Sequence, residues 1–185
     1  MNSRKFKAFI AFNWHWYLVI VLLMVFVFYY LFTSLMAPAY NEKLVIFIGH
    51  NYVDEIKMSA DLYKGFENTD ILVLEIDYSN PKDKDYGVIF NTRGMVNTDL
   101  IIISDDYIQE GKYHTYFAEI NTDDLRFEAA YFYDNEKVYG IDVTEVMKKY
   151  CDLGDEKYYL FLNKSSEKIN DEALIVIKNL LGENE

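Results

Sequence analysis

Polar side chains that could bind a ligand follow three apolar runs of this sequence. The group holds one histidine, three tyrosines, two amides, two hydroxyls and three carboxylates: His50, Asn51, Tyr52, Asp77, Tyr78, Ser79, Asn80, Ser104, Asp105, Asp106 and Tyr107. Gathered at one place, these groups would suit a sugar, a peptide or a cation. Asn, Ser and Asp also favour helix caps and turns for backbone reasons alone. From the sequence, ligand site and structural turns both remain open as interpretations.

The spacing of these residues does not match known catalytic or metal sites. The chain contains no G-x-S-x-G elbow, no P-loop and no H-E-x-x-H helix. His50 and His114 are single histidines without a paired metal spacing. The run from Asp77 begins like a calcium loop, but Pro81 falls at a ligand position and the required glycine is missing. We therefore expect no catalytic residue, no metal site, no cofactor and no enzyme activity.

The polar groups follow the apolar runs Leu44–Ile48, Ile71–Ile76 and Leu100–Ile103. Continuous runs rich in β-branched residues are typical of strands covered on both faces, as in a parallel sheet. Helical periodicity predicts a helix over Val53–Phe66 and a shorter one over Tyr86–Arg93, between successive runs. This β-α-β-α-β succession predicts the spatial strand order 2-1-3. The carboxyl ends of the three strands would then bring the polar groups to one edge of the sheet.

Capping residues predict where these helices begin and end. Asn51 is the expected N-cap of the first helix, and Gly65 lies near its end. Gly94 is expected to end the second helix. After the third strand, Ser104 is expected to cap a short helix that Gly111 ends.

The second half of the chain predicts strands of a different kind. Alternating apolar residues in Ala129–Tyr133 and Val138–Gly140, around the turn Asp134–Lys137, predict a hairpin. Tyr158–Leu162 predicts one more strand, and Ala173–Leu181 predicts a final helix with one apolar face. The predicted fold class is therefore α/β, with one mixed, mainly parallel sheet.

The N-terminal part of the chain predicts a membrane anchor. Residues 16–36 are 21 residues without a charged side chain, and such a helix spans roughly 30 Å, the hydrocarbon thickness of a bilayer. Residues 1–15 carry three basic side chains, so the positive-inside rule predicts a cytoplasmic N-terminus and an extracytoplasmic C-terminal part. Residues 1–15 form either an interfacial stretch or an extension of the helix. Residues 37–42 are then a linker, and residues 43–185 the extracytoplasmic α/β domain.

A cleavage signal at the end of this segment is the alternative to an anchor. Ala37-Pro38-Ala39 has the small-x-small pattern of a signal-peptidase site. The apolar regions of secretory signals are shorter, about 7–15 residues, so we expect the helix to be retained rather than cleaved at Ala39.

The charge of the chain limits the kinds of partner it can bind, and its cysteine content limits its disulfides. All 30 acidic residues follow Tyr40, whereas three of the 18 basic residues precede it, so the outer domain is more negative than the chain's formal net charge of −12. This charge argues against a nucleic-acid partner and would attract a cation or a basic protein surface. Cys151 is the single cysteine, so the chain cannot form an intrachain disulfide.

Four segments, in this order, resemble the N-terminal lobe of bacterial extracellular solute-binding proteins of the ABC-transporter type. They are KLVIFIGHNYVDEIKMSADLYKGFEN (43–68), NTDLIIISDDYI (97–108), YFYDNEKVYGIDV (131–143) and YYLFLNKSS (158–166). Asp142 stands where that family usually has a proline. The first segment is similar to the opening strand, turn and helix of the lobe. The N-terminal WHWYLVIVLL is similar to small membrane-anchored proteins of Gram-positive bacteria.

The resemblance implies a protein of the bacterial cell membrane with a periplasmic-binding-protein-like outer lobe. In that family the strand ending in Asn-Lys leads into a second lobe, but only 21 residues follow Lys164 here. We expect such a chain to be an interaction module that docks onto a transporter or another envelope protein. A solute- or cation-binding protein, whose half-site a partner or a dimer completes, is the alternative. A degenerate hydrolase is a further, less favoured one.

Overall fold

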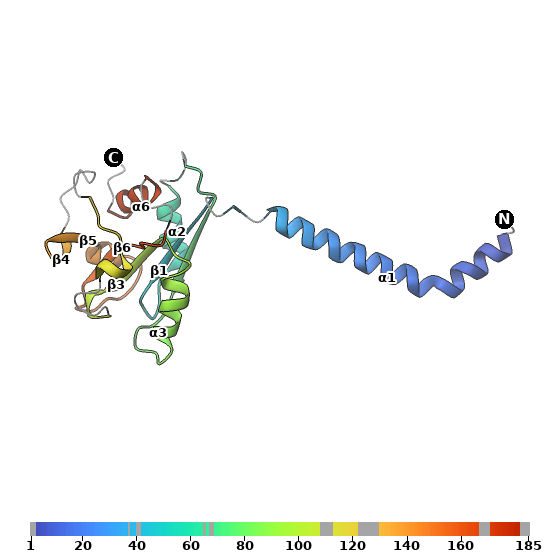
Figure 1. Cartoon of the computed structure of the whole chain (residues 1–185), viewed down its shortest axis with the longest axis horizontal. Helices are drawn as coiled ribbons and strands as arrows, with labels where there is room; N and C mark the ends of the chain where they lie inside the picture. Colours follow the sequence, from blue (N-terminus) through green and yellow to red (C-terminus); the bar gives the residue numbers. More distant parts are fainter. Residues whose placement is uncertain are drawn as a thin grey trace. The chain divides into compact units, whose positions relative to one another are not determined.

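The structure is a computed structural model of the whole chain. It describes residues 3–36, 38–39, 42–64, 66, 69–107, 113–121, 130–166 and 171–181, with the backbone alone at 3–13, 105 and 171–174. The chain divides into two compact units, Met1–Ala39 and Tyr40–Glu185 (Figure 1).

The first unit is one long helix. Helix α1 (Ser3–Met36) includes the basic N-terminal residues as well as the apolar segment. Its part Trp14–Met36 is, by length and composition, long and apolar enough to cross a membrane. The side chains of this part are exposed along its length, whereas the core helix of a soluble protein would bury one face.

The second unit is built on a six-stranded mixed sheet in the order β2-β1-β3-β6-β5-β4. Strand β1 (Lys43–Ile48) pairs in parallel with β2 (Val73–Tyr78) and with β3 (Leu100–Ser104). The predicted order 2-1-3 is therefore confirmed. Strand β2 begins two residues later than predicted, because its pairing with β1 starts at Val73, opposite Lys43, the first residue of β1.

The other half of the sheet is antiparallel, so the prediction of a mixed sheet is confirmed and the prediction of a mainly parallel one is wrong. Strand β6 (Tyr158–Leu162) pairs with β3 and with β5 (Lys137–Asp142), which pairs with β4 (Tyr131–Asp134). The predicted hairpin is present. Asn135 and Glu136 form its two-residue loop, both with positive φ, as the turns of tight hairpins require. Ala129 and Gly111 lie outside the described residues.

The first crossover helix, α2 (Glu55–Tyr63), begins later than the sequence predicted. Its N-cap is Asp54, whose carboxylate accepts a hydrogen bond from the Lys57 amide at 3.1 Å. The prediction of Asn51 as N-cap is therefore wrong. The chain first passes Tyr150, where the Asp54 amide donates to the Tyr150 carbonyl, and this contact delays the helix. Gly65 lies outside the described residues.

The second crossover changes its helical form. Helix α3 (Tyr86–Ile89) continues as the π-helix η2 (Phe90–Gly94), which ends at Gly94 as predicted. A Cβ atom on Gly94 would lie 3.0 Å from the Phe90 ring and 3.3 Å from the Phe47 ring. Glycine thus lets the end of η2 lie close to β1.

Four further short elements complete the described chain. They are η3 (Asp105–Tyr107), α4 (Tyr113–Tyr116), α5 (Thr144–Met147) and α6 (Asp171–Leu181).

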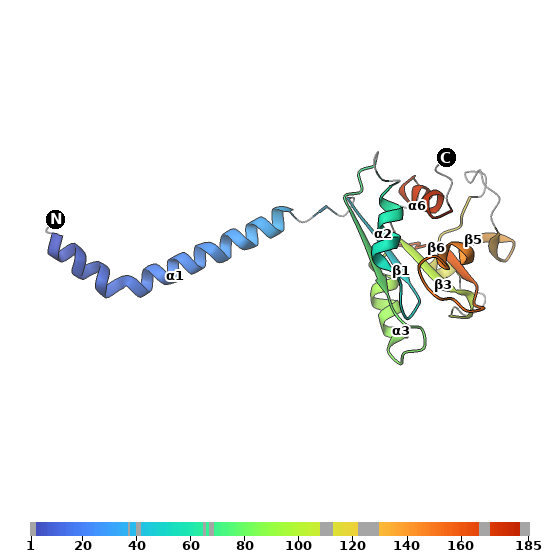
Figure 2. The same cartoon turned by 180° about the vertical axis from the view of Figure 1, so that it is seen from behind.

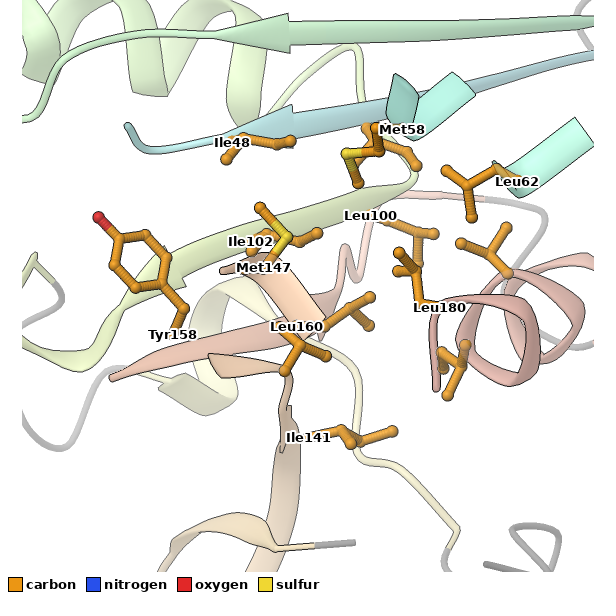
Figure 3. Packing of buried hydrophobic residues seen from close by; sticks show 14 of the residues in the cluster. Ile48, Met58, Leu62, Leu100, Ile102, Ile141, Met147, Tyr158, Leu160 and Leu180 are labelled. Carbon is orange, nitrogen blue, oxygen red and sulfur yellow. The ribbon is translucent and has the colours of Figure 1, made fainter. Parts of the chain in front are cut away.

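Side chains alternate along the strands between two cores. Helices α2, α5 and α6 cover one face, where an aliphatic core packs Ile48, Ile102 and Leu160 against Met58 and neighbouring side chains (Figure 3). Helix α3, η2 and α4 cover the other face, which is rich in aromatic rings. Both views show α2 and α6 side by side (Figure 2). The two crossover connections therefore lie on opposite faces, and the sheet has a topological switch point between β1 and β3.

Candidate functional site

A pocket of about 370 Å³ opens where the carboxyl ends of β1 and β3 meet the start of β6. We call it the edge pocket. Its lining residues are His50, Asn51, Asn80, Pro81, Lys82, Tyr107, Asp152, Leu153, Gly154, Asp155, Glu156 and Tyr158. Four of these were predicted from the sequence: His50, Asn51, Asn80 and Tyr107. They lie at the switch point, where open α/β sheets commonly bind ligands.

The sequence did not predict the other eight lining residues, of which Pro81 and Lys82 directly follow Asn80. The remaining six come from the 152–156 loop and from Tyr158 at the start of β6. Because β6 is antiparallel to β3, its first residue lies beside the last residue of β3, and Tyr158 pairs with Ser104. The loop has a turn signature, since the Asp152 carboxylate accepts from the Gly154 amide at 3.3 Å and Gly154 has a φ of +57°. That signature predicts a turn, but only the sheet order places it at this edge.

His50 connects the segment after β1 to the 152–156 loop. Its Nδ1 atom lies 2.7 Å from the Tyr52 carbonyl oxygen, and its Nε2 atom lies 2.9 Å from the Asp152 carbonyl oxygen. Its ring also stands edge-on to the Tyr158 ring, with the centroids 5.9 Å apart. The Tyr52 amide also donates to Nδ1, at 3.3 Å, so both ring nitrogens are engaged by backbone groups. An imidazole held in this way positions a loop and is poorly placed to act as a general base or a metal ligand.

Glu156 interacts with both tyrosines of the pocket, Tyr107 and Tyr158. The Tyr158 hydroxyl lies 3.2 Å from a Glu156 carboxylate oxygen and 3.2 Å from the Gly49 carbonyl oxygen. Burial, and then the Glu156 carboxylate, raise the pKa of Tyr158 above its usual range. The same two causes, in the same order, raise the pKa of Tyr107. Both hydroxyls therefore stay protonated at neutral pH and can act as hydrogen-bond donors.

Charge in the edge pocket is predominantly negative. Asp152, Asp155 and Glu156 contribute carboxylates, and Lys82 is the one basic residue of the described lining. The Lys82 ammonium lies 3.8 Å from Glu156. Among the residues whose placement is described, no group of three or more His, Cys, Asp or Glu side chains could hold a metal ion.

Several predicted site residues lie away from the pocket. Because side chains alternate along a strand, Asp77 faces the α3 side, where it pairs with Arg93 at 3.6 Å in a separate hollow of about 410 Å³. Tyr78 points the other way and packs against the aliphatic core. Tyr52 is 61% exposed and does not line the pocket.

The remaining predicted residues have backbone roles or lie at the surface. Ser79 and Ser104 are buried, and the Ser104 hydroxyl accepts from the Asp106 amide at 3.4 Å. Asp106 is exposed, and the side chain of Asp105 lies outside the described part of the chain. Asn80 both lines the pocket and accepts from the Lys82 amide at 3.0 Å. The turn interpretation therefore applies to part of the set, and the edge pocket gathers another part.

Comparison with solved structures finds a similarity to thiaminase I from Bacillus thiaminolyticus, with 15% identity and a TM-score of 0.35. The match covers 53% of this chain and 27% of that enzyme, so the chain spans about a quarter of the enzyme's length. A similarity of this extent does not establish a shared activity. No protein-family model matches the chain, and no curated protein matches it.

Proposed function

We propose that this chain is a single-pass protein of the bacterial cell membrane whose outer domain is an interaction module. The domain has a solute-binding-protein-like lobe and docks through its edge pocket onto another extracytoplasmic protein, such as a transporter component. An apolar helix with a basic N-terminal flank supports the anchor and its orientation.

The exposure of residues that line the edge pocket supports the docking proposal. Asn51, Lys82, Asp152 and Asp155 all line the pocket and are all exposed. Small-molecule sites typically bury about 70–90% of their ligand, whereas polar groups that stay hydrated contribute a net of roughly 0.5–1.5 kcal/mol per hydrogen bond. A few such contacts, less the cost of immobilising the ligand, give little more than millimolar affinity, about 4 kcal/mol. A protein surface can bury far more area over the same edge.

Site-specific photo-crosslinking in intact membranes tests the docking surface. A photoreactive amino acid replaces Tyr52, which is exposed and follows the pocket residues His50 and Asn51. The matched control places it at Tyr133, which is similarly exposed on β4. We expect a discrete protein adduct from position 52 and none of that mass from position 133. Equal adducts from both positions, or no adduct from position 52, would contradict the proposal.

A half-site for a small solute or cation, completed by a partner or a second copy, is the second candidate. The mixture of amides, tyrosines and carboxylates around the pocket favours it. Calorimetry on the full-length protein in mild detergent separates the two functions. We expect sugars, amino acids and short uncharged peptides to bind no more tightly than millimolar. Micromolar binding of one of these solutes would promote the second candidate.

A further inference from the structure

Glu156 is the carboxylate of the edge pocket with the best-defined surroundings. One of its oxygens lies 3.2 Å from the Tyr158 hydroxyl, which shares its single proton between this carboxylate and the Gly49 carbonyl. A carboxylate offers about four acceptor positions, so this contact leaves Glu156 able to accept further bonds on its pocket side. Its side chain is 34% exposed, which keeps it accessible from solvent while the protein screens it partly from water.

Lys82 shows which kind of group this carboxylate attracts. It comes from the loop after β2, and its ammonium approaches Glu156 to 3.8 Å. That separation is an ion pair but is longer than a hydrogen bond. Since the Lys82 side chain is 78% exposed, an exposed pair of this kind is weak and readily exchanged. A cation from outside could therefore replace Lys82 at little cost.

We infer that the edge pocket takes a basic side chain of the protein partner, which contacts Glu156 in place of Lys82. This inference rests on the proposed function and names the chemistry of the docked surface. Charge complementarity supports it, because the pocket lining has three carboxylates against one lysine and the whole chain has a formal net charge of −12. Tyr107 lines the same pocket, and a tyrosine ring attracts a cation that comes within about 6 Å.

A binding measurement with a defined basic probe tests the inference. The probe is tetralysine capped at both ends, titrated into the full-length protein in mild detergent. Glu156→Gln should weaken binding on the order of tenfold, the equivalent of one charge-assisted hydrogen bond. Glutamine keeps an acceptor for the Tyr158 hydroxyl, so the local fold is preserved. Lys82→Gln should strengthen binding several-fold, because it removes the internal competitor.

A matched control separates a local effect from general attraction to an acidic protein. Glu119 also forms an exposed ion pair, with Lys137, outside the edge pocket. Glu119→Gln makes the same change in net charge and should leave the affinity unchanged. Equal weakening by Glu119→Gln and Glu156→Gln would overturn the inference. A spermidine affinity equal to that of tetralysine would overturn the assignment to a protein segment, since spermidine is a free small cation.

Carbodiimide coupling supplies a second readout that does not depend on affinity. It joins a carboxylate to an amine in direct contact, and peptide mapping identifies the carboxylate. We expect tetralysine to couple mainly at Glu156, and coupling spread evenly over the acidic surface would overturn the inference. The proposed function is judged separately by the position-52 adduct. If that adduct forms in membranes and also survives Glu156→Gln undiminished, the docking function stands and the basic-side-chain inference fails.

Discussion

The Tyr158 hydroxyl lies 3.2 Å from the carbonyl oxygen of Gly49, although β3 separates their two strands in the sheet. Tyr158 is the first residue of β6, and Gly49 follows the last residue of β1. The buried side chain thus reaches across the end of β3 and fixes the floor of the edge pocket. This contact joins the parallel and antiparallel halves of the sheet.

Tyr158→Phe should destabilise the fold by roughly 1–2 kcal/mol, because it leaves the buried Gly49 carbonyl without this donor. Urea unfolding of the full-length protein in detergent measures the change. Tyr133→Phe, at an exposed position, should change the free energy of unfolding by less than about 0.5 kcal/mol. Equal stabilities of the Tyr158→Phe variant and the unmodified protein would show that the contact contributes nothing.

Asn163 should be among the least tolerant polar positions of the domain. Its fully buried amide donates to the carbonyl oxygens of Met95, at 3.0 Å, and Thr98, at 2.7 Å. Asn163→Asp turns the donor into an acceptor facing those two oxygens, and we expect a loss of roughly 3 kcal/mol or more. Asn91→Asp is the control, since the Asn91 amide is exposed and donates to one carbonyl. Similar melting temperatures for the two variants would contradict this role.

Replacement by alanine should change the stability of the fold differently at two glycines, Gly140 and Gly87. A Cβ atom on Gly140 would lie 2.8 Å from the Phe161 ring, whereas one on Gly87 in α3 would meet nothing within 4 Å. Gly140→Ala should cost roughly 1–3 kcal/mol through overpacking. Gly87→Ala should be neutral or stabilise the helix by up to about 1 kcal/mol. Thermal unfolding of both variants checks the prediction, and a stabilised Gly140→Ala would contradict it.

Alkaline pH should weaken the fold through Tyr150. Burial, and then its hydrogen bond to Asp61, raise the pKa of Tyr150 from 10.0 to about 12. Because the folded state binds this proton more tightly, the stability it contributes is complete below pH 10 and is lost between about pH 10 and 12. Tyr150→Phe should flatten the fall in stability over this range, measured by urea unfolding at successive pH values. An unchanged slope would contradict the assignment.

The single cysteine should make the topology of the protein easy to test. Cys151 is buried, and burial followed by Asp152 raises the pKa of its thiol to about 11, so it should resist maleimide labelling. A Gly87→Cys variant adds an exposed thiol on the outer domain. An impermeant maleimide added to intact cells should label this variant and leave the unmodified protein unlabelled. Labelling of Gly87→Cys only after lysis would contradict an extracytoplasmic domain.

Local sequence patterns predicted most of the sheet. The β-branched runs ending at Ile48 and Ile103 identify buried strands, and the residues between them have helical periodicity. The start of α2 was misplaced because its position depends on a distant contact, between Asp54 and Tyr150. Hydrophobic periodicity carries no information on such a contact.

Four of the twelve lining residues of the edge pocket could be predicted from the ends of parallel strands, and the others could not. His50 and Tyr107 follow strands whose carboxyl ends must meet. Glu156 belongs to a loop that reaches the pocket only because β6 inserts next to β3 in the opposite direction. The strand that pairs with β6 is determined by packing over the whole sheet. The sequence of β6 alone does not specify this partner.

At the opposite end of the parallel strands, Asp99 bonds to the backbone of β1 as a paired strand residue would. Its amide donates to the Val45 carbonyl at 2.9 Å, and its carboxylate accepts from the Val45 amide at 2.9 Å, just before β3 begins. Sliding β3 along β1 would break both bonds at once. Insertions and deletions between Gly94 and Asp99 should therefore be poorly tolerated, because they would shift the alignment of β3 on β1. In evolutionary terms, this end of the sheet is constrained to keep the alignment of β1 and β3.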